Sequence, residues 1–197
     1  MTLFTLSRRA ALAAAFLALA TISAAMPAKA EPRLTPELAA VRERLAKYRD
    51  PVAAVRDGYF STLGCVRYEG GAMGVHFLNP AHIGPEVDPA RPQILVYEPV
   101  GGRLELVAAE WFVPLATGVK ARPAIFGQPF NGPMAGHEPL MPESLHHYDL
   151  HVWLFKENPA GTFAPTNPAV SCEGYAYDFL EQPPAHVSHQ AAQAPAN

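Results

Sequence analysis

Residues 93–107 read QILVYEPVGGRLELV, and this stretch decides the fold class. Apolar and polar side chains alternate along 93–98 and again along 103–107, which is the pattern of a half-buried β-strand. Between the two runs, Gly101 and Gly102 suit the positive φ angles of a tight hairpin turn. The stretch therefore predicts two antiparallel neighbouring strands, the second of which can reach Val113 before Pro114 ends it.

Upstream of these strands the pattern is helical. Thr35 and Asp50 are capping residues, and each is followed by a proline at the first helical position. Apolar residues then follow at spacings of three and four, forming one stripe: Leu34, Leu38, Val41, Leu45 and Tyr48. We expect two N-terminal helices, the second running from Pro51 towards Tyr59.

Alternating runs also occur at residues 73–78 and from Tyr148 to Phe155. Together these patterns predict an α+β fold, with the two helices packed on an antiparallel sheet of four to six strands, curved into a half-barrel. The chain has 21 prolines, about twice the usual share, which predicts long ordered loops. The longest loop spans residues 120–143, a length typical of a lid or binding loop.

Residues 1–30 read as a signal peptide, with Arg8 and Arg9, an apolar run over 10–20, and a small-residue cleavage site ending at Ala30. The apolar run is shorter than the roughly 20 residues of a membrane span, so none is expected in the mature chain. The arginine pair partly matches a twin-arginine signal, but Ala11 stands where an aromatic is usual. Sec export to the periplasm or the medium is therefore favoured.

The mature chain is predicted to be one domain over residues 31–181, followed by a disordered tail over 182–197. The whole chain has a formal charge of −3, and loss of Arg8, Arg9 and Lys29 makes the mature chain more acidic. This charge excludes nucleic acid as a partner class. Cys65 and Cys172 are the only cysteines, and export favours a disulfide between them.

The densest group of chemically active side chains lies at residues 146–153, HHYDLHVW. On a strand, His147, Asp149 and His151 share one face, with neighbours about 7 Å apart and the two histidines about 13 Å apart. A single ion cannot bind both histidines comfortably at that distance. If the segment is helical instead, the two histidines form an i, i+4 pair that suits zinc.

A metal site on a sheet needs ligands from further strands, and here these are His76, Glu98 and Glu110. Gly74 shares a face with His76 and leaves room there for a ligand. Two histidines and a carboxylate with an open position suit zinc, iron or copper. Copper is slightly favoured over zinc by further soft or imidazole donors at Met73, Met134, His137 and Met141. The sequence therefore predicts an exported protein that binds such an ion, and it leaves open whether the protein is an enzyme. The candidate ligands are His76, Glu98, Glu110, His147, Asp149 and His151.

Interpretations without a metal ion also stay open. The histidines can be core or edge-strand residues paired with carboxylates or with the backbone. A second hypothesis is a non-enzymatic module that holds a small apolar ligand beneath the 120–143 loop, and a third is a structural envelope protein. The aromatic pocket of the second hypothesis is formed by Tyr97, Trp111, Phe126, Phe130 and Trp153. No Gly-x-Ser-x-Gly or HExxH motif appears, so no catalytic residue is assigned.

Three segments carry a resemblance to known sequences. They are GVHFLNP at 74–80, RPQILVYEP at 91–99, and HVW at 151–153 running on to NPAG at 158–161. In these the chain resembles a group of exported bacterial proteins that has no assigned activity. The resemblance implies export and a single domain, and it implies no catalytic role.

Overall fold

The computed structural model describes residues 32–189. The predicted signal peptide and residues 190–197 of the predicted tail lie outside this range. The helical elements are α1 (Pro36–Leu45), η1 (Ala46–Arg49), α2 (Pro51–Arg56), η2 (Pro80–His82) and η3 (Leu115–Thr117). The strands are β1 (Phe60–Tyr68), β2 (Gly71–Leu78), β3 (Ile94–Val100), β4 (Arg103–Pro114), β5 (Ala124–Ile125), β6 (Gln128–Pro129), β7 (Asn131–Met134), β8 (His147–Val152) and β9 (Asp178–Leu180).

The N-terminal helices begin where their capping residues predict. The Thr35 hydroxyl accepts a hydrogen bond from the Leu38 amide, and the Asp50 carboxylate accepts one from the Val52 amide. Only α1 is long, with 10 residues, while α2 has 6 and a 3-10 turn joins them. The expected pair of helices is therefore one helix, a tight turn and a short second helix.

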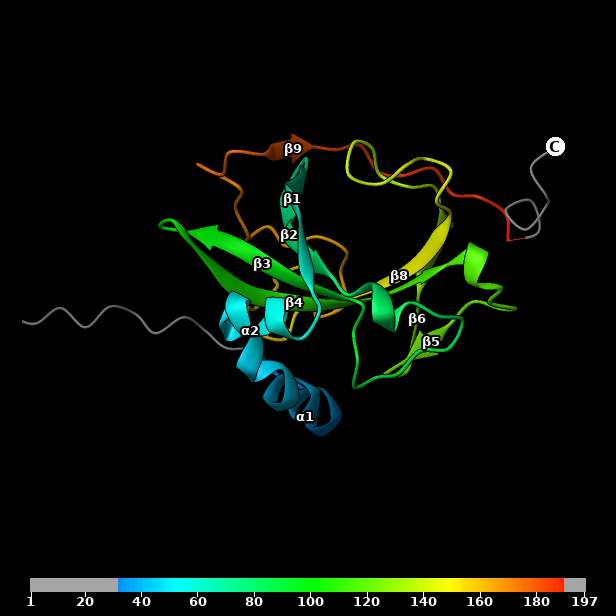
Figure 1. Ribbon diagram of the computed structural model, residues 1–197, viewed down its shortest axis with the longest axis horizontal. Coiled ribbons are helices and arrows are strands. Elements are labelled where there is room, and N and C mark those ends of the chain that lie inside the picture. The colour runs from blue at the N-terminus through cyan, green and yellow to red at the C-terminus, as the bar shows by residue number, and fades with distance from the viewer. Residues whose placement is uncertain (1–31, 190–197) are drawn as a thin grey trace, which may run out of the picture.

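The central element is a strongly curved sheet, as expected, and Figure 1 shows it as a half-barrel with α1 and α2 below it. Within residues 32–189 it has seven strands rather than four to six, in the order β7-β8-β4-β3-β2-β1-β9. The β1–β9 pair is parallel, and the other neighbouring strands are antiparallel. The predicted hairpin of residues 93–107 is β3 and β4, which pair from Ile94 and Glu110 to Val100 and Arg103.

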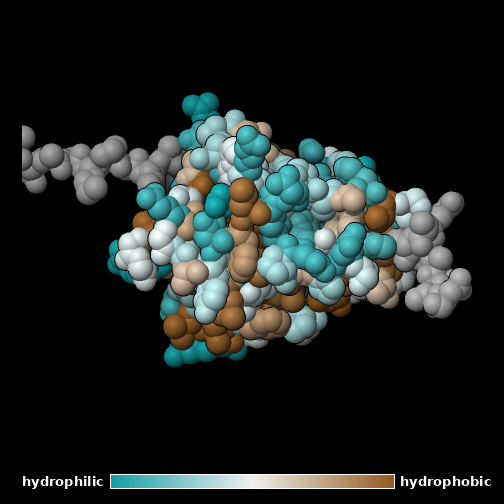
Figure 2. All heavy atoms as spheres, turned by 90° about the horizontal axis from the view of Figure 1, so that it is seen from above, coloured by the Kyte–Doolittle hydropathy of each residue, from teal (hydrophilic) through white to brown (hydrophobic). Residues whose placement is uncertain are grey.

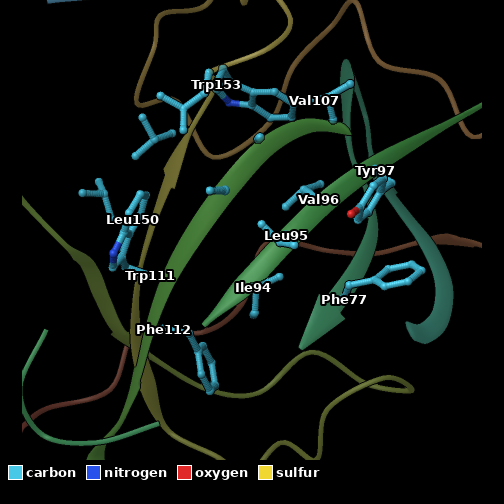
Figure 3. Close-up of a cluster of buried hydrophobic side chains, with 14 of the residues drawn as sticks. Phe77, Ile94, Leu95, Val96, Tyr97, Val107, Trp111, Phe112, Leu150 and Trp153 are labelled. Carbon is cyan, nitrogen blue, oxygen red and sulfur yellow. The ribbon is translucent and has the colours of Figure 1, made fainter. Parts of the chain in front are cut away.

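The two faces of the sheet differ in chemistry. Leu95, Trp111 and Leu150 belong to the buried hydrophobic core, which Figure 3 shows against β3, β4 and β8. Side chains alternate between the faces of a strand, so the residues next to Trp111 on β4 belong to the other face. These are Glu110 and Phe112, which lie opposite His151 and Asp149 of β8. The β4–β8 register therefore places a polar group on the face opposite Trp111.

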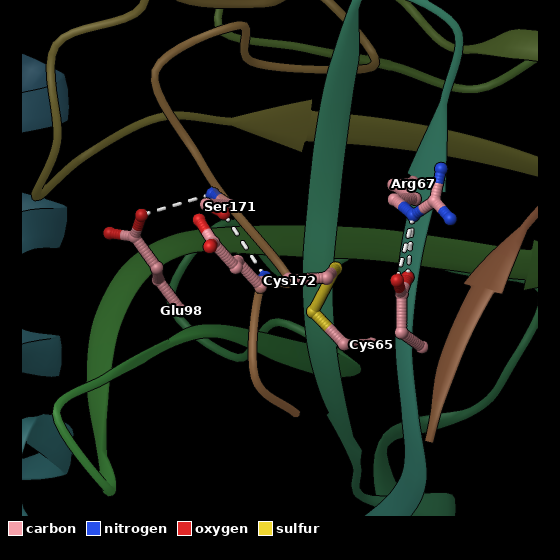
Figure 4. The surroundings of a disulfide bond; sticks show 7 residues. Cys65, Arg67, Glu98, Ser171 and Cys172 are labelled. Carbon is pink, nitrogen blue, oxygen red and sulfur yellow. Dashed lines mark hydrogen bonds and ion pairs between the residues drawn. A yellow bond between two sulfur atoms is a disulfide. The ribbon is translucent and has the colours of Figure 1, made fainter. Parts of the chain in front are cut away.

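A disulfide joins Cys65 of β1 to Cys172, as the sequence predicts. The two cysteines are 107 residues apart in sequence and 5.7 Å apart at their Cα atoms. Figure 4 shows the bond between β1 and the segment that leads to β9, with the Arg67–Asp178 ion pair beside it. The bond thus fixes the late part of the chain to an early strand.

The last described residues form a strap between the two edges of the sheet. Asp178–Leu180 pair with β1 as β9, and further on Ala135 donates a hydrogen bond to the Ala185 carbonyl while Val187 donates one to Pro133. An isolated bridge also joins Met134 and His186. Residues 185–187, within the segment predicted to be a disordered tail, therefore lie beside Pro133–Ala135 at β7. We call residues 178–187 the C-terminal strap.

Figure 2 shows one face of the molecule, where hydrophilic side chains cover most of the surface and hydrophobic ones gather in a few groups. Large apolar side chains that stay half exposed or more are Val52, Val55, Phe60, Leu63, Tyr177 and Leu180. Among residues 32–189, no helix combines the length and the apolar character needed to cross a membrane.

Candidate metal centre

A cavity of about 240 Å³ lies between the polar face of the sheet and a covering loop. Strands β2, β3, β4 and β8 supply one wall. Residues 137–145, which we call the covering loop, supply another. Most of the wall is aliphatic, methionine or phenylalanine. The polar residues that line the cavity are Thr62, His76, Glu110, His137, His147, Asp149, His151 and Glu181.

Three of these polar residues converge at one place. His76 on β2, Glu110 on β4 and His151 on β8 bring their ring nitrogens and carboxylate together. Nε2 of His76 lies 3.4 Å from Oε2 of Glu110, and Nε2 of His151 lies 3.3 Å from the same oxygen. We call these three residues the HEH cluster.

The HEH cluster is buried, and its polar atoms are poorly satisfied. The side chains of His76, Glu110 and His151 are 12%, 5% and 1% exposed. Oε2 of Glu110 and both ring nitrogens of His151 are buried without a hydrogen-bond partner. An unpaired buried polar atom costs about 1–3 kcal/mol, so three of them at one point indicate a site built for a further binding partner.

The electrostatics of the cluster favour an ionised carboxylate. Burial alone raises the pKa of Glu110, but the neighbouring imidazoles of His151 and His76, when protonated, outweigh burial and lower that pKa to about 2. Glu110 is therefore an anion at neutral pH. An anionic oxygen between two imidazoles is a donor set that could hold a transition-metal ion.

A second group of possible ligands lies in the same cavity, formed by His137, His147 and Asp149. Here most polar atoms already have partners. Nδ1 of His147 lies 3.0 Å from the Leu145 carbonyl, and Asn131 donates to Asp149 at 3.3 Å. Nε2 of His147 and Oδ2 of Asp149 are 3.9 Å apart. Burial lowers the pKa of His147 in spite of Asp149, so its ring is neutral at neutral pH.

His137 belongs to a hydrogen-bonded network with Tyr68 and Glu181. Its Nδ1 lies 2.8 Å from the Tyr68 hydroxyl and 3.1 Å from Oε2 of Glu181, and the Tyr68 hydroxyl donates to the same carboxylate oxygen at 2.9 Å. Burial lowers the pKa of His137, but the hydrogen bond and charge of Glu181, helped by Asp149 and Glu110, raise it overall. A protonated His137 therefore stabilises the contact between the loop and the C-terminal strap.

The network predicts a pH dependence of stability. Because the folded-state pKa of His137 is raised, its contribution to folding is present below the ordinary pKa near 6.5 and is lost as the pH rises through the raised value. The His137→Gln variant should therefore be destabilised more at about pH 5.5 than at about pH 8.5. Urea unfolding with a chelator present measures this difference. The same comparison with His186→Gln, at an exposed position, should show no such trend.

The covering loop is closed at a narrow neck. A Cβ atom on Gly136 would lie 1.9 Å from the Pro142 carbonyl oxygen, so only glycine fits there. The Gly136 amide also donates to the Glu143 carbonyl at 3.0 Å. Beyond the neck, Leu140 packs where Gly64 of β1 has no side chain, since a Cβ there would lie 2.6 Å from it. These contacts hold the loop over the cavity.

The structure brings together only some of the residues predicted as ligands. His76, Glu110 and His151 form one cluster, whereas His147 and Asp149 join His137 in the other. The strand spacing that separates His147 from His151 explains this division. Glu98 is in neither cluster: both of its oxygens bind Lys156, at 2.7 and 2.6 Å, and one also accepts from the Ser171 amide.

The predicted aromatic pocket residues lie elsewhere. Tyr97, Trp111, Phe130 and Trp153 are fully buried in the hydrophobic core, and Phe126 packs against Trp111. None of the five lines the cavity beside the HEH cluster. They are large apolar side chains on or near strands, and such residues fill a core by default.

The space beside Gly74, where the sequence predicts room for a ligand, is filled by protein backbone. Gly74 has a φ of +117°, and a Cβ there would lie 2.5 Å from the Tyr97 carbonyl oxygen. The missing side chain thus admits the backbone of β3 and not a ligand. This close approach lies at the start of the β2–β3 pairing that positions His76.

Tyr68 and Glu181 are not among the residues that the sequence predicts for the site, and His137 is expected there only as a further imidazole donor for copper. Glu181 directly follows β9, and His137 lies within the covering loop. No periodic pattern indicates that these two residues meet. The only available signal is that His137 lies in a long loop rich in glycine and proline.

Comparisons with known proteins add no assignment. No family model matches the chain, and neither a curated protein nor a solved structure matches it.

Proposed function

We propose that this is an exported protein that binds one divalent transition-metal ion through His76, Glu110 and His151. The observation that carries the proposal is the buried convergence of these three side chains around unpaired polar atoms. Two neutral imidazoles and one carboxylate leave at least one coordination position open for water or a ligand.

The distances within the cluster support ion binding over hydrogen bonding. A charge-assisted N–H···O bond is about 2.7–2.9 Å long. The two N···O separations are 3.4 and 3.3 Å, longer than such a bond. Two ligand atoms that each lie about 2.1 Å from an ion at tetrahedral angles are about 3.4 Å apart. The spacing therefore matches ligands of a common ion.

The second group is the weaker candidate. Its atoms are 3.9 Å apart in the His147–Asp149 pair, and hydrogen bonds already use one atom of each member. By contrast, His151 has both ring nitrogens unpaired. An ion at the HEH cluster would give a partner to buried polar atoms that otherwise have none. The second group has fewer such atoms, so an ion would stabilise it less.

The nature of the donors limits the choice of ion. The cysteines form a disulfide and are not available as thiolates. Imidazole and carboxylate donors suit zinc, iron(II) or copper(II), and copper(II) is expected to bind most tightly by the usual order of affinities. The disulfide is consistent with an oxidising compartment, which supports export.

The test is metal binding by purified protein after treatment with a chelator. Titration with zinc, followed by calorimetry and by elemental analysis after gel filtration, should give about one ion per chain. Cobalt(II), as a spectroscopic substitute, should give the intense visible bands of a low-symmetry site. His76→Ala and His151→Ala should each abolish stoichiometric binding.

His147→Gln is the matched control, because it removes a buried histidine from the same strand and the same cavity. This variant should still bind one ion. Binding that is weak and substoichiometric in the wild type, or that is lost equally in His147→Gln and His151→Ala, would contradict the proposal.

A further inference from the structure

We propose that the cavity binds a small organic monoanion with an apolar body, whose anionic head occupies the open position of the metal ion. This inference rests on the proposed metal centre and names the class of molecule that the centre receives. It follows from three properties of the cavity: its lining, its size and its distribution of charge.

Most of the residues that line the cavity are apolar. Leu78 of β2, Ile83 in the turn after η2 and Ile94 of β3 line the cavity. Leu140, Met141 and Leu145 line it from the covering loop. Such walls offer few hydrogen bonds to a charged or sugar-like body, whereas burial of a hydrocarbon body against them is favourable. The body of the ligand is therefore aliphatic or aromatic.

The volume sets the size of the ligand. A cavity of roughly 150 Å³ in a protein interior holds benzene. In proportion, the cavity of about 240 Å³ accommodates a molecule of about ten heavy atoms. A phenyl or medium-length alkyl group with one polar head meets this limit. A nucleotide or an oligosaccharide is too large.

The net charge of the metal centre determines the charge of the ligand's head group. A divalent ion with the single anionic donor Glu110 carries a net charge of +1 in a buried, apolar place. An isolated buried charge is costly, and a monoanion at the open position neutralises it. The carboxylates Asp149 and Glu181 also line the cavity, outside the HEH cluster, and they repel an anion. A carboxylate head therefore binds at the ion in the HEH cluster.

The experiment compares two probes that differ mainly in charge, cinnamate and cinnamyl alcohol, by calorimetry on zinc-loaded and metal-free protein. We expect cinnamate to bind the zinc-loaded form at least about tenfold more tightly than the metal-free form. Cinnamyl alcohol should bind at least about tenfold more weakly than cinnamate. In the cobalt(II)-substituted protein, cinnamate should shift the visible bands, since it replaces a ligand of the ion.

Ile83→Trp fills the cavity from a position outside the HEH cluster, and at equal zinc content it should weaken cinnamate binding at least about tenfold. Val52→Trp, on the exposed side of α2, is the control and should bind cinnamate like the wild type. Zinc binding without cinnamate binding overturns this inference and leaves the metal centre standing. Equal binding of alcohol and acid overturns the anionic head. Absence of zinc binding overturns both proposals.

Discussion

Excess metal is expected to stabilise the wild-type protein and to leave Glu110→Gln almost unchanged. At a free metal concentration one hundred times the dissociation constant, the free energy of unfolding should rise by about 2.7 kcal/mol. Loss of a residue that merely orients a ligand costs up to about a hundredfold in metal affinity, and loss of a charged ligand should cost at least as much. At the same metal concentration, Glu110→Gln should then gain only about 0.4 kcal/mol.

The measurement is urea unfolding of each protein with a chelator and with buffered metal. Asp149→Asn is the matched control, because it removes another buried carboxylate from the same cavity, on the neighbouring strand β8. That variant should keep the full metal-dependent rise. A rise of equal size in wild type and Glu110→Gln would show that the carboxylate is not a ligand, and an equal loss in Asp149→Asn would assign the ion elsewhere.

Removal of the disulfide should produce the largest change in stability without metal. In the chain-entropy model, a cross-link that closes a loop of about one hundred residues stabilises a protein by about 4.7 kcal/mol, and the Cys65–Cys172 separation is 107 residues. Since domains of this size are stable by about 5–15 kcal/mol, the Cys65→Ala/Cys172→Ala variant should lose about a third of its stability or more.

Chemical denaturation of the double variant beside the wild type measures this loss. Reduction of the wild type should lower its stability by a similar amount, whereas the same reductant should not affect the double variant. A loss below about 1 kcal/mol would mean that Arg67–Asp178 and the β1–β9 pairing already hold the two segments together.

The parts of the fold that the sequence predicts well are those specified by local patterns. Proline and capping side chains mark the starts of α1 and α2, and the Gly101-Gly102 turn marks the hairpin of β3 and β4. The number of strands is harder to predict. β1 is irregular in its register, and β9 has only three residues that pair with a strand more than one hundred positions earlier. Such pairing depends on the whole fold.

The candidate metal centre was predictable to the extent that strand spacing constrains it. Alternation along β8 separates His147 from His151, and pairing with β4 puts Glu110 opposite His151. The arrival of His76 from β2 has a different origin, because β3 lies between β2 and β4. Its ring reaches Glu110 because the sheet curls, and no local pattern in the sequence specifies the degree of curvature.

The C-terminal strap affects how easily the chain aggregates before folding is complete. A strand at the edge of a sheet exposes backbone groups that can pair with another molecule, and here one segment occupies both edges, β1 and β7. That segment is synthesised after strands β1–β8 of the described part of the chain. Until it arrives, both edges are open to intermolecular pairing, so a chain truncated before Asp178 should aggregate even if its hydrophobic core can form.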